Sequence, residues 1–368
     1  MQIKKKVLKT AIPALIFAMG IASACFYFHF TSRESKQRSF SYTAFLNEVY
    51  DVIQQNYWQK ISEKELNRLF YLATKKINPE FNKAEPKTRE ELNKNLSEVL
   101  ADKTAEEKEK FAVFLADIVL KNLKPLGRSA LYQEKDKKAL VAKVENINPK
   151  TGKAEPTVLA KIISPNTAYI QIKRFSPSTF NEFCKATDSL EAKIKSRVNS
   201  LILDLRGNIG GSIDILPYFL GPFIGKDQYA YEFYHQGARV VFKTKTGWLN
   251  SLVRYKKVVV LIDGKTQSTA ELMASVLKKY NVGVLIGERT RGWGTIERVF
   301  PLANCPDMNK KYYLFLVHSL ALRDDNQPIE GRGVEPVVNI KSPNWQKELL
   351  AYFSSEDFVR DIERILEK

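Results

Sequence analysis

Cysteine and histidine are scarce in this sequence, which contains three of each in 368 residues. Cys184 and Cys305 are the only cysteines after residue 30, and their spacing fits no zinc site. The sequence leaves open whether they form one disulfide in an oxidising compartment or serve as small apolar side chains. We therefore expect neither a metal site nor a cofactor.

Glycine and proline are also infrequent, with 17 and 15 residues, while 44% of the residues are hydrophobic and 11% are aromatic. This composition excludes a fibrous or disordered protein and is typical of a globular one. No internal repeat is evident. The length allows one substantial core and a smaller second one.

Acidic residues are outnumbered, because 41 Asp and Glu face 58 Lys and Arg and the net charge is +17. Such a surplus raises the question of contact with nucleic acid or an anionic membrane. The lysines, however, are spread along the chain and interleaved with glutamates, as in "KTREELNKNLSEVLADKTAEEKEK". We interpret most of the charge as solvated surface and expect no nucleic-acid partner.

The N-terminus contains the one long uncharged stretch, residues 11–30, which follows four lysines within the first nine residues. A stretch of this length can span a hydrocarbon core of ~30 Å, and preceding positive charge keeps that end in the cytoplasm. Residues 1–30 are therefore predicted to be a signal anchor that places the rest of the protein on the exported, extracytoplasmic side of the cell membrane. Two alternatives remain open: cleavage after "ASA" at Ala22–Ala24, which gives a secreted form, and lipid attachment to Cys25.

Hydrophobic periodicity divides the rest of the chain. Residues 40–135 carry apolar side chains at helical spacing, as at Phe45 and Val49, and predict a helical N-terminal domain. Residues 156–343 alternate short apolar segments with helical ones, which predicts an α/β core with largely parallel, buried strands. Residues 344–368 are predicted to form a C-terminal helix.

Three segments follow predicted strands, where an α/β fold places its functional groups. In "LILDLRGNIGGSIDIL", residues 201–216, a glycine pair exposes backbone N–H groups near a helix start, which suits an anion or an oxyanion. In "VVVLIDGKTQSTAEL", residues 258–272, Ser268 stands at a strand-to-helix turn, a position shared by nucleophiles and ordinary N-caps. The third segment, "GERTRGWGTIE" at 287–297, ends in a strand that we expect to pair with residues 310–325.

Together these segments resemble the C-terminal processing peptidases, also called tail-specific proteases, which have a ClpP/crotonase-like fold. The family's "DLRGNPGG", "SASE", "GExTxGKGxxQ" and "IxGxGIxPD" segments are matched in the same order by "DLRGNIGG" at 204–211, "STAE" at 268–271, "GERTRGWGTIE" at 287–297 and "IEGRGVEP" at 329–336. The resemblance covers about residues 165–340. It implies that Ser268 is the nucleophile and that the backbone N–H groups of Gly211 and Thr269 form the oxyanion hole, where each donor contributes about a hundred- to a thousand-fold.

The same resemblance exposes two departures. The family's general base is a lysine between two glycines, and this place holds Trp293; the glutamine four residues later is Glu297. An indole cannot accept the serine proton, so the Ser–Lys mechanism cannot operate here in its usual form. Residues 126–165 are also too few for the PDZ domain that the family usually carries before its core.

A glutamate is the partner that a histidine base needs, because it accepts the Nδ1–H and stabilises the imidazolium. His318 lies on the strand expected to pair with that of Glu297, so we hypothesise a Ser268–His318–Glu297 triad. His318 as a purely structural residue, and His235 or an unplaced lysine as the base, remain alternatives.

These features predict an exported, membrane-anchored serine endopeptidase that hydrolyses unfolded or extended polypeptides. A catalytically inactive family member that binds peptides or a protein partner is the alternative. A scaffold or adaptor that acts through its helical region and basic surface is a third hypothesis. For the helical region itself, gating, partner binding and self-association into a homo-oligomer remain open.

Overall fold

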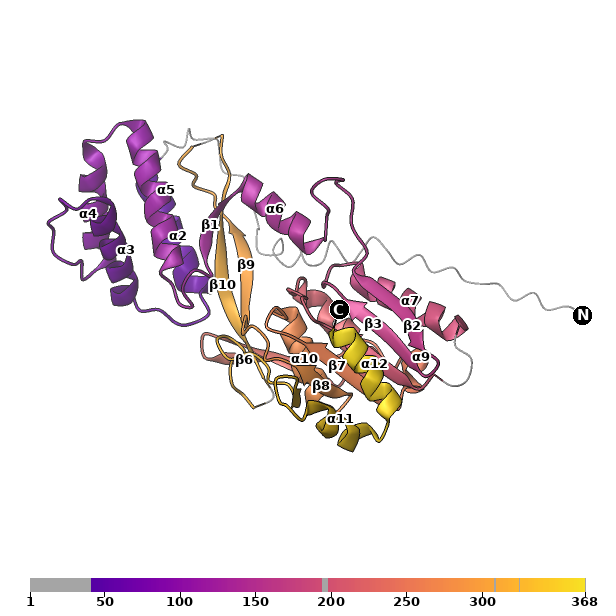
Figure 1. Ribbon diagram of the computed structural model, residues 1–368. Coiled ribbons are helices and arrows are strands. Elements are labelled where there is room, and N and C mark those ends of the chain that lie inside the picture. The colour runs from indigo at the N-terminus through magenta and orange to yellow at the C-terminus, as the bar shows by residue number, and fades with distance from the viewer. Residues whose placement is uncertain (1–40, 194–197, 308, 324, 368) are drawn as a thin grey trace, which may run out of the picture. The chain divides into compact units, whose positions relative to one another are not determined.

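The computed structural model describes residues 41–193, 198–307, 309–323 and 325–367 (Figure 1). The predicted signal anchor at residues 1–30, together with its cleavage and lipidation alternatives, lies outside the described residues. Within the described part of the chain, no helix has both the length and the apolar character needed to cross a membrane.

The core contains a six-stranded sheet with the strand order β11-β8-β7-β4-β3-β2. All neighbouring strands are parallel except β2 and β3, which are antiparallel. The strands are β2 (Val158–Ser164), β3 (Thr167–Ile172), β4 (Ser200–Asp204), β7 (Lys257–Ile262), β8 (Val284–Gly287) and β11 (Val338–Asn339). Every residue of β4 is buried, as expected for a central strand that is covered on both faces. The predicted mixed α/β fold is confirmed.

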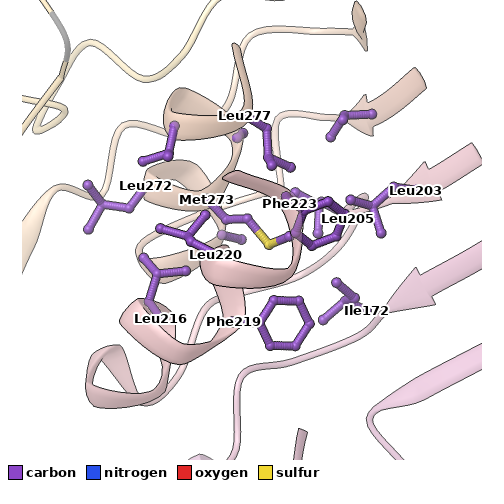
Figure 2. Packing of buried hydrophobic residues seen from close by; sticks show 14 of the residues in the cluster. Ile172, Leu203, Leu205, Leu216, Phe219, Leu220, Phe223, Leu272, Met273 and Leu277 are labelled. Carbon is purple, nitrogen blue, oxygen red and sulfur yellow. The ribbon is translucent and has the colours of Figure 1, made fainter. Parts of the chain in front are cut away.

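Helices cover both faces of this sheet. On one face, Phe219 and Phe223 of α8 and Met273 of α10 pack against Ile172 and strand residues beside it (Figure 2). The helices of this layer are α7 (Thr179–Lys193), the 3-10 turn η1 (Ile213–Ile215) with α8 (Leu216–Ile224), α9 (Asn250–Val253) and α10 (Thr269–Lys279). The other face packs against α11 (Trp345–Phe353) and α12 (Glu356–Leu366).

A second sheet connects the core to the N-terminal helices. Its strand order is β1-β10-β5-β6, and β9 pairs with β10 in addition. The strands are β1 (Ala130–Gln133), β5 (Tyr229–His235), β6 (Ala238–Lys243), β9 (Thr295–Pro301) and β10 (Tyr312–Leu322). The antiparallel pairing of β9 with β10 confirms the partner that the sequence predicted for residues 287–297.

The N-terminal helices pack on this second sheet. They are α2 (Tyr42–Asn56), α3 (Glu63–Ile77), α4 (Arg89–Ala101) and α5 (Ala105–Lys121), and α6 (Glu134–Val144) follows β1. Tyr312, Leu314 and Leu316 of β10 share one buried cluster with these helices. Residues 41–368 therefore form one compact unit, and the helical segment is not a separate domain as the periodicity suggested.

Three further sequence predictions can be compared with the structure. The single C-terminal helix predicted for residues 344–368 is wrong, because Ser354 adopts a left-handed conformation with φ of 47° and separates α11 from α12. Cys184 and Cys305 are both free thiols, so they do not pair. Residues 126–165, the segment that is too short for a PDZ domain, contain β1, α6 and β2.

Candidate functional site

Ser268 lies in a sharp turn between the end of β7 and the first residue of α10. Its backbone has φ of 58° and ψ of −126°, a conformation that costs a non-glycine residue about 1–3 kcal/mol. Such a turn from strand to helix lifts a serine hydroxyl out of the sheet edge, as in nucleophile elbows. Ser268 is partly exposed, so the hydroxyl can be reached from outside.

The glycine turn of residues 204–211 packs directly against this serine. A Cβ atom at Gly210 would lie 2.7 Å from the Ser268 Cβ, so a side chain at residue 210 would collide with Ser268. The Gln267 N–H donates to the Asn208 carbonyl at 2.9 Å, and the Thr269 hydroxyl donates to the Gly211 carbonyl at 3.1 Å. The sequence therefore brings its first two motifs together through hydrogen bonds between their turns.

The two backbone donors predicted for an oxyanion hole lie at these turns. Among the described residues, neither the Gly211 N–H nor the Thr269 N–H donates a hydrogen bond to another protein group. Thr269 N–H is at the first residue of α10, where the helix dipole is positive. Both groups are free to bind an oxygen of a ligand, and their role as an oxyanion hole stays a prediction.

Glu271 ties the Ser268 turn to the loop that carries Trp293. Its side chain is fully buried and its two oxygens accept four hydrogen bonds. The donors are the backbone N–H groups of Ser268 at 2.8 Å, Gly292 at 2.7 Å and Trp293 at 2.8 Å, and the Thr290 hydroxyl at 2.5 Å. Burial raises the pKa of Glu271, and the four donors oppose that rise. Glu271 is thus a structural link between the Ser268 turn and the Trp293 loop.

Two contacts hold the indole of Trp293, one on the ring and one at its nitrogen. The guanidinium carbon of Arg128 lies 3.4 Å from the ring centroid, a close cation–π contact. The indole Nε1 donates to Glu297 Oε1 at 3.3 Å. The position of the family's lysine therefore holds a neutral aromatic group between a cation and a carboxylate.

Arg128 is itself anchored by Glu330. Its Nη2 and Nε lie 2.9 and 3.2 Å from Glu330 Oε1, and both side chains are largely buried. The second oxygen, Glu330 Oε2, accepts the Gly294 N–H at 2.8 Å. Arg128 comes from the loop before β1, and Glu330 belongs to the fourth motif. The Arg128–Glu330 ion pair thus packs against the Trp293 ring.

The expected hydrogen bond between Glu297 and His318 is absent, and this prediction was wrong. Glu297 accepts from the Thr295 hydroxyl at 2.5 Å and from Trp293, and burial raises its pKa. Val317 is the cross-strand partner of Glu297, and a β-bulge between Val317 and Ser319 leaves His318 without a ladder partner. Since neighbouring residues of a strand point to opposite faces, Val317 takes the face of Glu297.

His318 lies instead against His235. The two imidazole rings stack with centroids 4.1 Å apart and planes 4° from parallel, and His318 Nδ1 is 2.8 Å from the Ser319 hydroxyl. Burial, the charge of Arg298 and the charge of His235 lower the pKa of His318 to about 3. A general base is most effective when its pKa is near the working pH, so this imidazole is a weak candidate.

The described residues include no group that is placed to activate the Ser268 hydroxyl through a hydrogen bond. Among the described residues, no imidazole, amine or carboxylate makes a hydrogen bond with the Ser268 hydroxyl. In the same part of the chain, no group of three or more His, Cys, Asp or Glu is arranged to hold a metal ion. No motif marks Arg128, so the sequence offers no signal for its role. Glu330 stands between the isoleucine and the first glycine of the fourth motif, where its carboxylate could have been noticed.

The comparisons with known proteins agree with the four motifs. The model of peptidase family S41 matches residues 166–340. The carboxy-terminal processing protease CtpA of Bacillus subtilis is 31% identical over 192 residues, which is 52% of this chain and 38% of that protease. The related CtpB of the same organism is 27% identical over 187 residues, 50% of this chain and 36% of CtpB. The matched part of this chain thus spans less than two fifths of these relatives.

Two solved structures share the fold. The photosystem II D1 C-terminal processing protease superposes with a TM-score of 0.55 at 14% identity, covering 82% of this chain and 93% of that protein. A lipoprotein from Streptococcus agalactiae superposes with a TM-score of 0.53, also at 14% identity, covering 89% and 99% of the two chains. These similarities extend over the N-terminal helices as well as the core, and at this identity they concern the fold alone.

Proposed function

We propose that the core of this chain, whose residues 166–340 match the model of peptidase family S41, binds extended polypeptides at the Ser268 turn without hydrolysing them at the rate of a serine–lysine peptidase. The observation that carries the proposal is the indole of Trp293, held between Arg128 and Glu297 at the position of the family's lysine. The chain keeps the fold and the free backbone N–H groups of Gly211 and Thr269. The position of the family's lysine holds an indole, which cannot act as a base.

The neighbours of Trp293 cannot replace that base. A guanidinium has no acceptor site and stays protonated in proteins, so Arg128 cannot take the serine proton. Glu297 is occupied by two donors. Loss of the base lowers the rate of a serine peptidase by on the order of 10⁴-fold.

A serine endopeptidase that uses Ser268 is the second candidate, and the conformation of Ser268 favours it. A strained φ of 58° at a serine is retained only where the surrounding structure enforces it, and such strain clusters at active sites. This reading needs a base that approaches Ser268 only when substrate is bound. The membrane-anchored, exported placement predicted from residues 1–30 is part of the proposal in either form.

A fluorophosphonate probe separates the two candidates. We expect the wild-type protein to remain unlabelled, as does Ser268→Ala. Trp293→Lys restores an amine at the family's position, and its neutral form can act as base. We therefore expect Trp293→Lys to gain labelling that Trp293→Lys combined with Ser268→Ala lacks.

Binding is measured separately from hydrolysis. Fluorescein-labelled casein, an extended polypeptide, should bind the wild type and Ser268→Ala equally in fluorescence anisotropy and stay intact on a gel. Ser268-dependent labelling or casein cleavage by the wild-type protein would overturn the non-hydrolysing form and leave the endopeptidase. Failure of both proteins to bind casein would overturn the peptide-binding function.

A further inference from the structure

A second feature lies at the end of the parallel strands that is opposite to Ser268. A pocket of about 650 Å³ opens beside the first residues of β4 and β7, where it is lined by Leu201 and Val258. Ser268 follows the other end of β7, whose six residues at about 3.3 Å each separate the two sites by roughly 20 Å. The pocket is therefore distinct from the candidate peptide site.

Two large apolar side chains at this pocket are exposed to solvent. Trp248 is 64% exposed and Val253 is 55% exposed, although both line the pocket. The indole rests on the backbone of Gly225, where an added Cβ would lie 2.9 Å from the indole nitrogen. The Trp248 N–H donates to no other described residue. The ring is thus held in a fixed place by its contact with glycine, with its polar edge available to a partner.

The chain around Trp248 is strongly basic. Residues 243–257, "KTKTGWLNSLVRYKK", contain five Lys and Arg and no acidic residue. Arg254 is paired with Glu191 at 2.8 Å, but Lys245 and Lys256 are exposed and make no ion pair with a described residue. Lys226, next to Gly225, is exposed as well. Exposed apolar side chains in a segment that carries exposed lysines and no acidic residue are complementary to a partner that is both apolar and anionic.

We propose that this surface binds an anionic lipid bilayer. We call it the Trp248 patch; it comprises Trp248, Val253, Lys226, Lys245 and Lys256. Tryptophan favours the membrane interface because its ring is apolar and its N–H can reach the headgroups. Lysines near an anionic surface add attraction that decreases with salt. This contact is separate from the N-terminal segment and independent of whether Ser268 is active.

Docking through the Trp248 patch would orient the core. Because the patch and Ser268 lie at opposite ends of the same strands, the peptide site would face away from the bilayer. An extended polypeptide in solution could then enter the site while the protein stays on the membrane surface.

Quenching of tryptophan fluorescence by brominated acyl chains tests the proposal on the full-length protein. The vesicles contain brominated phosphatidylcholine, either alone or mixed equally with phosphatidylglycerol. None of the four tryptophans lies in residues 1–40, so insertion of that segment does not itself bring a fluorophore into the bilayer. We compare the wild type with Trp248→Phe, and with Trp345→Phe in α11 as the matched control.

We expect quenching in the anionic vesicles that is lost in Trp248→Phe and kept in Trp345→Phe. Lys245→Glu combined with Lys256→Glu should require about tenfold more anionic lipid for half-maximal quenching, as should high salt. Quenching of Trp248→Phe equal to that of the wild type would overturn the proposal. Equal quenching of the wild type in neutral and anionic vesicles would overturn it too.

Discussion

Replacing Glu271 by alanine should disconnect the Ser268 turn from the Trp293 loop. The carboxylate is fully buried and is the acceptor for three backbone N–H groups, those of Ser268, Gly292 and Trp293. In Glu271→Ala these donors lose their partner, and the Gly292 N–H is buried away from water while those of Ser268 and Trp293 are partly buried. Each buried donor left unpaired costs about 1–3 kcal/mol.

The expected total is smaller than the simple sum. Losses within one network are not additive, and the variant no longer buries a carboxylate. We expect Glu271→Ala to lower the free energy of unfolding by roughly 4 kcal/mol. Glu271→Gln should cost roughly 1–3 kcal/mol, because its amide can still accept from Ser268 and Trp293 and donate to the Thr290 hydroxyl, leaving the Gly292 N–H unpaired.

Thermal and urea unfolding measure these differences. For a unit of this size, the loss in Glu271→Ala corresponds to a Tm lowered by roughly 6 °C. Hydrogen exchange should also quicken at Gly292 and Trp293. Glu106→Ala is the control, because Glu106 lies on the helix surface in an exposed ion pair with Lys110 and should leave the Tm unchanged. If Glu271→Ala unfolds at the temperature of this control, the network does not hold the loop.

Two further predictions concern stability. His318 has a pKa of about 3 in the folded protein against 6.5 when unperturbed, so below about pH 6.5 the unfolded chain takes up a proton that the folded protein refuses. Stability should therefore fall by about 2 kcal/mol more in the wild type than in His318→Gln between about pH 6.5 and 4.5; parallel urea-unfolding profiles of the two proteins would contradict this. Gly211→Ala places a Cβ 2.0 Å from the Phe175 carbonyl oxygen at a φ of 140°, and should lower the free energy of unfolding by ~3 kcal/mol in urea titrations. A wild-type midpoint for this variant would show that the glycine turn can rearrange freely.

Much of the fold could be predicted from the sequence because it depends on local periodicity. The alternation of apolar strands with helices predicted the α/β core, and the Ser268 turn was expected where a buried strand meets a helix start. The antiparallel pairing of the strand that ends "GERTRGWGTIE" with residues 310–325 was expected as well. These features are set by side-chain spacing along a few residues, which the sequence displays directly.

The arrangement of side chains around Ser268 and Trp293 was decided by tertiary structure. The register of β9 and β10 pairs Glu297 with Val317, so the neighbouring His318 points to the opposite face, because the side-chain period of a strand is two. Arg128 reaches the Trp293 ring from a loop outside every motif, and only folding brings the two together. The sequence by itself determined that the lysine is missing; the structure decided that a cation and a carboxylate hold the indole in its place, since contacts between distant segments leave no periodic signal in the chain.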